Sequence, residues 1–296
     1  MSVVLTLTAP AKTFLIGEYL ALTGGPTLIL TTAPPFKLTV SQPGRAVSHL
    51  HPHSPAGRLL QAHPQLADTY HFEFHDPYQQ QGGLGASSAQ FLLVYQALHQ
   101  LAQTPLISWQ QSTIETLLTC YQTHSWSGQG LPPSGADLVA QAIGGVCHFT
   151  RKPFALTQYT WPFPQMDGTV VHTRHKLATH QHLMNHPSSP NKTLLTLAQQ
   201  AVAAFQQPCA LTFAQTLQAY GDCLANYDLV TDASRNWLAT IQTLTGVLAS
   251  KGCGALGADT LFILTEADAT TTVRQWLIQH QLPVIATTEQ ITTGLA

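Results

Sequence analysis

The order of hydrophobic periodicities along the chain constrains its fold more than any other feature. Residues 3–8, 26–32, 36–41 and 70–75 alternate between apolar and polar or run apolar, as short strands do. From Ser87 onward, apolar side chains instead recur every three or four residues, as on a buried helix face. Strands followed by mixed elements lack the regular rhythm of a doubly wound sheet, so the sequence predicts an α+β protein.

The rest of the chain divides into further predicted elements and two lobes. Residues 42–68 are rich in Pro, Gly, Ser and His and indicate a loop with one short helix near 58–62. We expect helices at 87–102, 109–121, 136–143, 192–206, 211–227, 233–250 and 267–281, and strands at 146–150, 169–173, 260–265 and 283–287. We place the two lobes at 1–165 and 166–296.

Composition argues against several classes of protein. Charged residues make up 9 % of the 296 residues, against roughly 25 % in a typical soluble domain. The sequence contains no basic run of the kind that would indicate a nucleic-acid partner. No stretch approaches the roughly 18 uncharged apolar residues of a membrane helix. The first residues lack the basic region of a signal peptide, and five cysteines without a CxxC pair favour a reducing compartment. We therefore expect a cytoplasmic protein, a monomer or homodimer, whose partner is a small molecule.

A glycine-rich stretch gives the strongest local signal for function. Residues 82–89, Gly-Gly-Leu-Gly-Ala-Ser-Ser-Ala, stand directly before an amphipathic helix. Glycines let the backbone approach a ligand closely, and the unpaired N–H groups of a helix start attract anions. The stretch predicts a polyphosphate cradle, although a glycine turn with a serine N-cap would have the same sequence. It matches neither the Walker pattern nor the dinucleotide-binding fingerprint.

Three further motifs contain charged residues that are scarce elsewhere. Residues 9–19 carry Lys12 and Glu18, and residues 132–145 place Asp137 in the first turn of a short helix. Residues 251–259 form a small-residue stretch that enters a strand. Each motif also has an ordinary explanation: a solvated lysine, an aspartate against a helix dipole and a tight turn between lobes.

Taken together and in this order, the four motifs resemble those of the GHMP kinases. Lys12, Gly17 and Glu18 match the first family motif, with Ala11 in place of its glycine. Gly83, Leu84, Gly85 and Ser87 match the phosphate loop, whereas Ala86 and Ser88 depart from it; residues 133–137 match Pro-Ser-Gly-x-Asp at each fixed position. In the closing motif, Cys253, Leu256 and Ala258 differ from the family pattern.

The resemblance implies a fold, an activity and a set of site residues. The fold would pair an N-terminal lobe like ribosomal S5 domain 2 with a ferredoxin-like C-terminal lobe, and the protein would use ATP and Mg²⁺. By position, Asp137 would be the catalytic base, Lys12 its partner and Ser87 a ligand of Mg²⁺. The phosphates would bind at Gly83, Leu84, Gly85, Ala86, Ser87 and Ser88, and the acceptor at Glu18, Tyr19, Ser134, Gly135, Arg174, Lys176, Gly254 and Ala255.

The acceptor alcohol is harder to predict than the reaction. Gly17-Glu-Tyr19 and Asp259 are similar to phosphomevalonate kinases, whereas Pro133-Ser-Gly-x-Asp137 is similar to mevalonate kinases. We place phosphomevalonate first and mevalonate second. Arg174 and Lys176 are then candidates for holding the anionic end of a phosphorylated acceptor, because Lys and Arg number only 12 in the chain.

The sequence also allows a protein of another class. Histidines gather at two places in the sequence with His-x-His spacing, which binds Zn²⁺ or Ni²⁺ in some proteins. These are His49, His51 and His53, followed by His172, His175, His180, His182 and His186. The alternative is a metal-binding or regulatory protein that keeps the kinase scaffold without turnover. The plainer explanation is that histidine replaces Lys and Arg on a surface with few charges.

Overall fold

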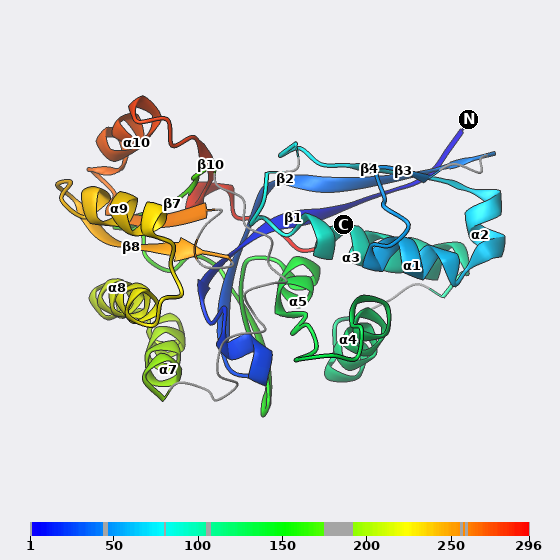
Figure 1. Cartoon of the computed structure of the whole chain (residues 1–296), viewed down its shortest axis with the longest axis horizontal. Coiled ribbons are helices and arrows are strands. Elements are labelled where there is room, and N and C mark those ends of the chain that lie inside the picture. Colours follow the sequence, from blue (N-terminus) through cyan, green and yellow to red (C-terminus); the bar gives the residue numbers. More distant parts are fainter. Residues whose placement is uncertain are drawn as a thin grey trace.

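The computed structural model describes residues 2–43, 47–79, 81–104, 108–174, 192–254, 257 and 260–295. Two separate sheets with packed helices form the structure, which confirms the predicted α+β class. In Figure 1 the long strands β1 (Ser2–Ile16) and β2 (Thr27–Gln42) cross the molecule between the two groups of helices.

The first sheet has six strands built around the β1–β2 hairpin. Its order is β3 (Val47–Ser48), β4 (His71–His75), β2, β5 (Val146–Arg151) and β6 (Phe154–Tyr159), with β1 also paired to β2. The hairpin is joined by a short 3₁₀ turn, η1 (Leu20–Thr23). Shifts of register between Ala9 and Ala11 and between Phe14 and Ile16 bend β1, so that its second half reaches the other lobe.

Five helices accompany this sheet: α1 (Pro55–Gln61), α2 (Pro64–Thr69), α3 (Ala86–Leu101), α4 (Gln111–Ser125) and α5 (Ala136–Ile143). Helices α3 and α5 pack directly on β1 and β2. Helix α3 is apolar on nearly all sides, and Phe91, Leu92, Leu93 and Val94 are all fully buried. It is therefore the centre of the first core rather than a surface helix.

The second sheet has four antiparallel strands in the order β10 (Val284–Thr287), β7 (Met166–His172), β9 (Thr260–Glu266) and β8 (Val247–Cys253). Helices α8 (Ala210–Asn226), α9 (Asp232–Ile241) and α10 (Thr270–Gln279) pack on it, and α7 (Lys192–Gln206) packs on α8 and on β2. A 3₁₀ turn, η3 (Thr288–Gln290), follows β10. Within the described ranges, no helix is both long and apolar enough to cross a membrane.

The structure corrects several predicted elements. The predicted strands 26–32 and 36–41 are one strand, β2, and the predicted helix 233–250 ends at Ile241. Gly246, with φ +82°, turns the chain there into β8, whose residues pair with β9. Apolar residues continue at helical spacing through Leu244 and Leu248, but this glycine and pairing with β9 end the helix and form a strand. Strands β3 and β6 and helix α2 were not predicted.

One of the hydrophobic clusters joins the two sheets. Leu15 of β1 and Leu28 of β2 belong to the same buried cluster as Phe163, Phe213 and Leu217 near the second sheet. A buried hydrogen bond also crosses the boundary, because the Gly17 amide donates to the Tyr220 hydroxyl at 3.1 Å. Burial and the nearby Glu18 carboxylate raise the pKa of Tyr220 well above its usual value, so the phenol stays protonated.

A buried ion pair adds a polar contact to this apolar boundary. Lys251 on β8 donates through Nζ to Oε1 of Glu18, which follows β1, and also to the Phe14 carbonyl at 3.3 Å. The Lys251 side chain is fully buried and that of Glu18 is 7 % exposed. Burial alone would lower the pKa of Lys251, but the neighbouring Cys253 sulfur and Glu18 carboxylate raise it, so the ammonium stays charged.

We expect Lys251→Met to destabilise the fold strongly, because it leaves the Glu18 carboxylate buried without its cation. Breaking a buried pair on one side costs roughly 3–5 kcal/mol of unfolding free energy. Adding Glu18→Gln to the same chain removes the orphan charge and should recover much of that loss. Urea titration followed by circular dichroism measures both effects.

The matched control is Asp228→Asn, which breaks the ion pair with Arg235 where the Asp228 side chain is 90 % exposed. That variant should lose no more than about 1 kcal/mol. A Lys251→Met protein as stable as Asp228→Asn would contradict the importance assigned to the buried pair.

Candidate functional site

A cavity of ≈ 1110 Å³ brings parts of all four predicted motifs together. Its wall includes Lys12 of β1, the glycine-rich loop 82–87 before α3, Asp137 of α5 and Gly254 after β8. These residues lie up to 242 positions apart in the sequence (254 − 12), and the fold brings them to one place. The cavity is therefore the candidate site.

The glycine-rich loop has the geometry of an anion cradle. Gly83 and Gly85 have φ values of +87° and +86°, which L side chains rarely adopt. Gly85 is the N-cap of α3, and no side chain caps that helix start. The first N–H groups of α3 and the positive end of its dipole are thus open to an anion.

The two serines of the loop have different surroundings. Ser87 lines the cavity, as predicted for a residue that contacts phosphate or metal. Ser88 is 1 % exposed, and its hydroxyl donates to the Gly85 carbonyl at 2.9 Å. Ser88 therefore stabilises the shape of the loop from its buried side, and it is absent from the cavity wall.

Lys12 is joined to the loop through both its backbone and its side chain. Its amide donates to the Leu84 carbonyl at 3.0 Å, and its Nζ donates to the Gly83 carbonyl at 3.2 Å. The ammonium also lies 5.1 Å from the centre of the Phe14 ring, close enough for a cation–π interaction. A residue that is only 8 % exposed is thus held at the cavity wall.

Asp137 reaches the same wall from the first turn of α5. One helical turn further on, the Gln141 amide donates to the Pro10 carbonyl at 2.8 Å and to the Gly85 carbonyl at 3.1 Å. Gln141 therefore ties the helix of Asp137 to the strand of Lys12 and to the loop. Burial first, and then the Asp137 carboxylate, raises the pKa of Tyr121 on the adjoining α4.

Ser134 and Gly135 shape the start of α5. Gly135 has φ +69°, and a Cβ there would lie 2.3 Å from Cδ2 of Leu118. The Ser134 hydroxyl accepts a hydrogen bond from the Ala136 amide at 3.3 Å. Neither residue is part of the cavity wall, so their visible contacts position the helix, and the predicted contact with an acceptor stays a prediction.

The other predicted acceptor residues divide into three groups. Gly254 lines the cavity, as expected. Glu18 is engaged in the buried pair with Lys251, and neither Glu18 nor Tyr19 belongs to the cavity wall. Arg174, with φ +63°, is exposed after β7 and away from the wall. Lys176 and Ala255, with Leu256, Ala258 and Asp259, lie outside the described residues.

The remaining residues of the cavity wall were not predicted as site residues. They come from the loop before α1, the end of β4 and the turn that follows β4, with one glutamine from α3. They are His49, Leu50, His51, Pro52, Phe74, His75, Asp76, Gln79, Gln81 and Gln90. No motif contains them, although His49 and His51 belong to the first group of histidines considered as possible metal ligands.

A divalent cation fits this site together with phosphates. The described wall offers the Ser87 hydroxyl and the carboxylates of Asp76 and Asp137, and Mg²⁺ binds proteins through one or two carboxylates together with substrate phosphates. Across the ranges that the structure describes, no group of three His, Cys, Asp or Glu side chains could hold a metal ion. His175, His180, His182 and His186 lie outside those ranges.

Solved structures share this fold over almost the whole chain at low sequence identity. The Methanococcus jannaschii mevalonate kinase matches with a TM-score of 0.74 and 10 % identity over 98 % of each chain. The Lactococcus lactis galactokinase complexed with galactose matches with a TM-score of 0.76 and 13 % identity over 98 % of this chain and 94 % of that one. The Streptococcus pneumoniae phosphomevalonate kinase in complex with phosphomevalonate and AMPPNP matches with a TM-score of 0.75 and 18 % identity over 97 % of this chain and 99 % of that one.

A homoserine kinase from Cytophaga hutchinsonii has the same fold at 12 % identity and a TM-score of 0.67. No family model matches the sequence, and no curated protein matches it by sequence. The chain therefore has the two-lobe fold of the GHMP kinases, as its motifs predicted.

Proposed function

We propose that the protein is an ATP-dependent kinase that phosphorylates a small alcohol. One observation carries the proposal: Lys12, the loop 82–87 and Asp137 line one cavity, with the open start of α3 at its wall. Phosphoryl transfer needs positioning, neutralisation of charge and one group that accepts a proton. These residues supply each of those requirements, and the proteins with this fold named above are kinases.

Each residue has a proposed part in the reaction. The N–H groups at the start of α3 bind the phosphates of the nucleotide, and Lys12 neutralises charge on the phosphoryl group being transferred. The Asp137 carboxylate takes the proton of the acceptor hydroxyl. The acceptor oxygen forms its bond to phosphorus as the bond between that phosphorus and the bridging oxygen of ADP breaks. Magnesium would bind the phosphates together with Ser87 and would supply further positive charge.

For the acceptor we propose phosphomevalonate first and mevalonate second. The similarity to a structure solved with phosphomevalonate supports the first choice, and a Leishmania major mevalonate kinase solved with R-mevalonate has the same 18 % identity. Arg174 is the described cation that we propose for the phosphate of the acceptor. Lys12 is already assigned to the phosphoryl group being transferred, and Lys251 is paired with Glu18.

A coupled assay of ADP release tests the activity and the acceptor together. Purified protein is assayed with Mg²⁺ and ATP over phosphomevalonate, mevalonate, homoserine and galactose. Turnover of phosphomevalonate supports the first choice, and turnover of mevalonate alone favours the second. If none of the alcohols is phosphorylated and the purified protein contains stoichiometric zinc or nickel, the metal-binding alternative replaces the kinase.

The loop gives a direct test of nucleotide binding through Gly85→Ala. A Cβ there would lie 2.7 Å from Cγ of Lys12 and 3.0 Å from Nε2 of Gln141, on a backbone with φ +86°. The added carbon displaces the lysine or the loop, so the Kd of ATP measured by calorimetry should rise roughly tenfold or more, which is about 1.4 kcal/mol.

Gly128→Ala is the matched control for this test. Gly128 has a similar φ of +84°, but nothing lies within 4 Å of its added Cβ. Its Kd for ATP should equal that of the wild type. Equal affinities in the Gly85 and Gly128 variants would show that the loop does not bind the nucleotide.

Asp137→Asn tests the proposed base. The substitution is nearly isosteric and removes the proton acceptor, so kcat should fall by roughly 10²–10⁴-fold while the KM for ATP changes little. Asp232→Asn is the control, because Asp232 also lies in the first turn of a helix but is exposed on α9. A kcat within a few-fold of wild type in both variants would leave Asp137 with a purely structural role at the helix start.

A further inference from the structure

The segment from Thr288 to Leu295 connects the second sheet to the helix that carries Asp137. It leaves β10 of the second sheet and pairs with the first lobe, through isolated bridges of Ile291 with Thr32 and of Thr293 with Gly144. We call this segment, residues 288–295, the strap. Its partners on the first lobe lie at the β2 strand and at the end of α5.

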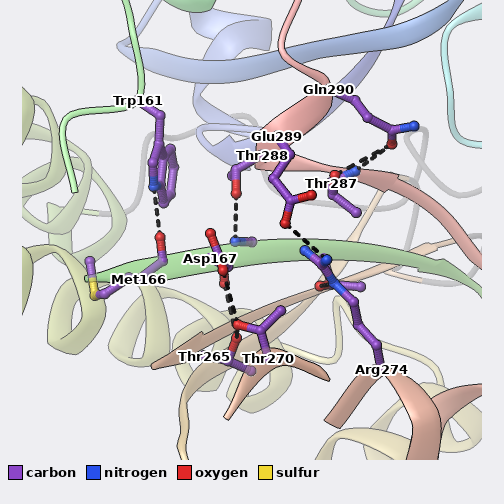
Figure 2. Close-up of polar contacts among 12 residues, drawn as sticks. Trp161, Met166, Asp167, Thr265, Thr270, Arg274, Thr287, Thr288, Glu289 and Gln290 are labelled. Atoms are coloured by element: carbon purple, nitrogen blue, oxygen red, sulfur yellow. Dashed lines mark hydrogen bonds and ion pairs between the residues drawn. The ribbon is translucent and has the colours of Figure 1, made fainter. Parts of the chain in front are cut away.

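The strap is anchored on the second sheet by side chains. The Gly168 amide of β7 donates to the Thr288 hydroxyl at 2.9 Å, and Arg274 of α10 forms an ion pair with Glu289 at 3.0 Å. The Thr287 amide donates to Oε1 of Gln290 at 3.0 Å, which closes the turn η3. Figure 2 shows Thr288 above β7 and Glu289 of the same turn directed toward Arg274 of α10. The strap therefore moves with the second sheet.

At its other end the strap caps helix α5. The Leu295 amide donates to the Ala142 carbonyl at 3.2 Å, and the Gly145 amide donates to the Thr292 carbonyl at 2.9 Å. The Ala142 carbonyl is one of the last four of the helix, which have no partner within the helix itself. The strap thus supplies a hydrogen bond that α5 cannot make alone.

The contact is close as well as polar. A Cβ on Gly294 would lie 2.1 Å from the Ala142 carbonyl oxygen and 2.6 Å from the carbonyl carbon of Ile143. A Cβ on Gly144 would lie 2.1 Å from the Gly294 amide nitrogen. Both backbones meet without room for a side chain, so the end of α5 cannot shift while the strap stays in place.

Helix α5 is short enough for this contact to reach the site. Its eight residues span roughly 12 Å at 1.5 Å per residue, with Asp137 in the first turn and Ala142 in the last. Gln141 fixes the middle of the helix to β1 and to the loop, and the strap fixes its end. The direction of the helix, and hence the place of the Asp137 carboxylate, depends on both attachments.

We propose that the strap is a positioning element that holds Asp137 at the cavity wall and links its place to that of the second sheet. This inference rests on the proposed function, in which Asp137 accepts the proton of the alcohol. The nucleotide cradle depends on the strap less than Asp137 does. Gln141 of α5 donates to the Gly85 carbonyl, but Lys12 and the Ser88 hydroxyl hold the loop without α5. The strap should therefore affect turnover more than the binding of ATP.

Gly294→Ala tests the proposal with the smallest possible change. Amide hydrogen exchange in 138–143 should speed up roughly tenfold or more, because the cap on α5 is displaced. In the coupled assay kcat should fall roughly tenfold or more, since small misplacements of a catalytic group have large effects. The KM and Kd for ATP should stay within about threefold of wild type.

Two further variants complete the experiment. Thr293→Ala changes an exposed side chain at the neighbouring position of the strap and keeps the backbone pairing, so exchange and kcat should match the wild type. Thr288→Val removes the hydroxyl that accepts from Gly168 without approaching α5. It should change exchange and kcat in the same direction as Gly294→Ala, and it serves in that variant's place should Gly294→Ala not fold.

The outcomes separate this proposal from the proposed function. If amide hydrogen exchange in α5 is unchanged in both Gly294→Ala and Thr288→Val, the proposed role of the strap is overturned, whatever the kinetic results are. Faster exchange with wild-type kcat also overturns it, because Asp137 would then not need to be held. A wild-type protein that phosphorylates none of the alcohols overturns the proposed function, and the exchange data still show whether the strap holds α5.

Discussion

The structure depends on the ion pair between Glu18 and Lys251 at the boundary of the two lobes. Glu18 follows the first strand, and Lys251 lies on a strand of the second sheet with its side chain fully buried. Gly254, three residues beyond Lys251, lines the cavity that also contains Lys12 of the same first strand. The pair thus fixes the two elements that bring both lobes to the cavity. Its energetic value lies less in net attraction than in the cost of leaving either charge unpaired, and this cost makes other arrangements of the lobes unfavourable.

The sequence predicted the parts of the site that depend on local backbone chemistry. A glycine pair before an apolar helix has few structural solutions, and the positive φ of Gly83 and Gly85 is the one expected. Lys12 and Asp137 were assigned through their motifs, and the structure brings both to the cavity. Glu18 was assigned to the acceptor on the same grounds, but its visible partner lies 233 residues away, and no local pattern announces a partner at such a distance.

Prediction was poorest where tertiary contacts outweigh local preference. The predicted helix 233–250 ends at Ile241, because Gly246 turns the chain and pairing with β9 makes a strand of Val247–Cys253. The cavity wall formed by His49, Leu50 and His51 comes from a loop whose sequence indicates only irregular structure. The strap pairs with the first sheet through backbone bridges at Thr32 and Gly144 and through the Thr31 hydroxyl, which donates to the Thr292 carbonyl at 3.3 Å. No motif in the strap identifies these partners. The cavity wall and the strap both depend on partners that are distant in the sequence.

The scarcity of charge limits how an anionic acceptor can be held. The phosphate group of a phosphorylated acceptor carries a charge of about −1.5 to −2, and burying that group requires cations or several N–H donors. Lys12 is the only Lys or Arg on the cavity wall among the described residues, and its ammonium is already bonded to the loop. Three histidines and one lysine line that wall, and a neutral imidazole offers one N–H donor where an arginine offers five. A phosphorylated acceptor would therefore need a cation from beyond the described wall, such as Arg174, which mevalonate would not need. The choice between these two proposed acceptors then depends on whether such a cation reaches the cavity.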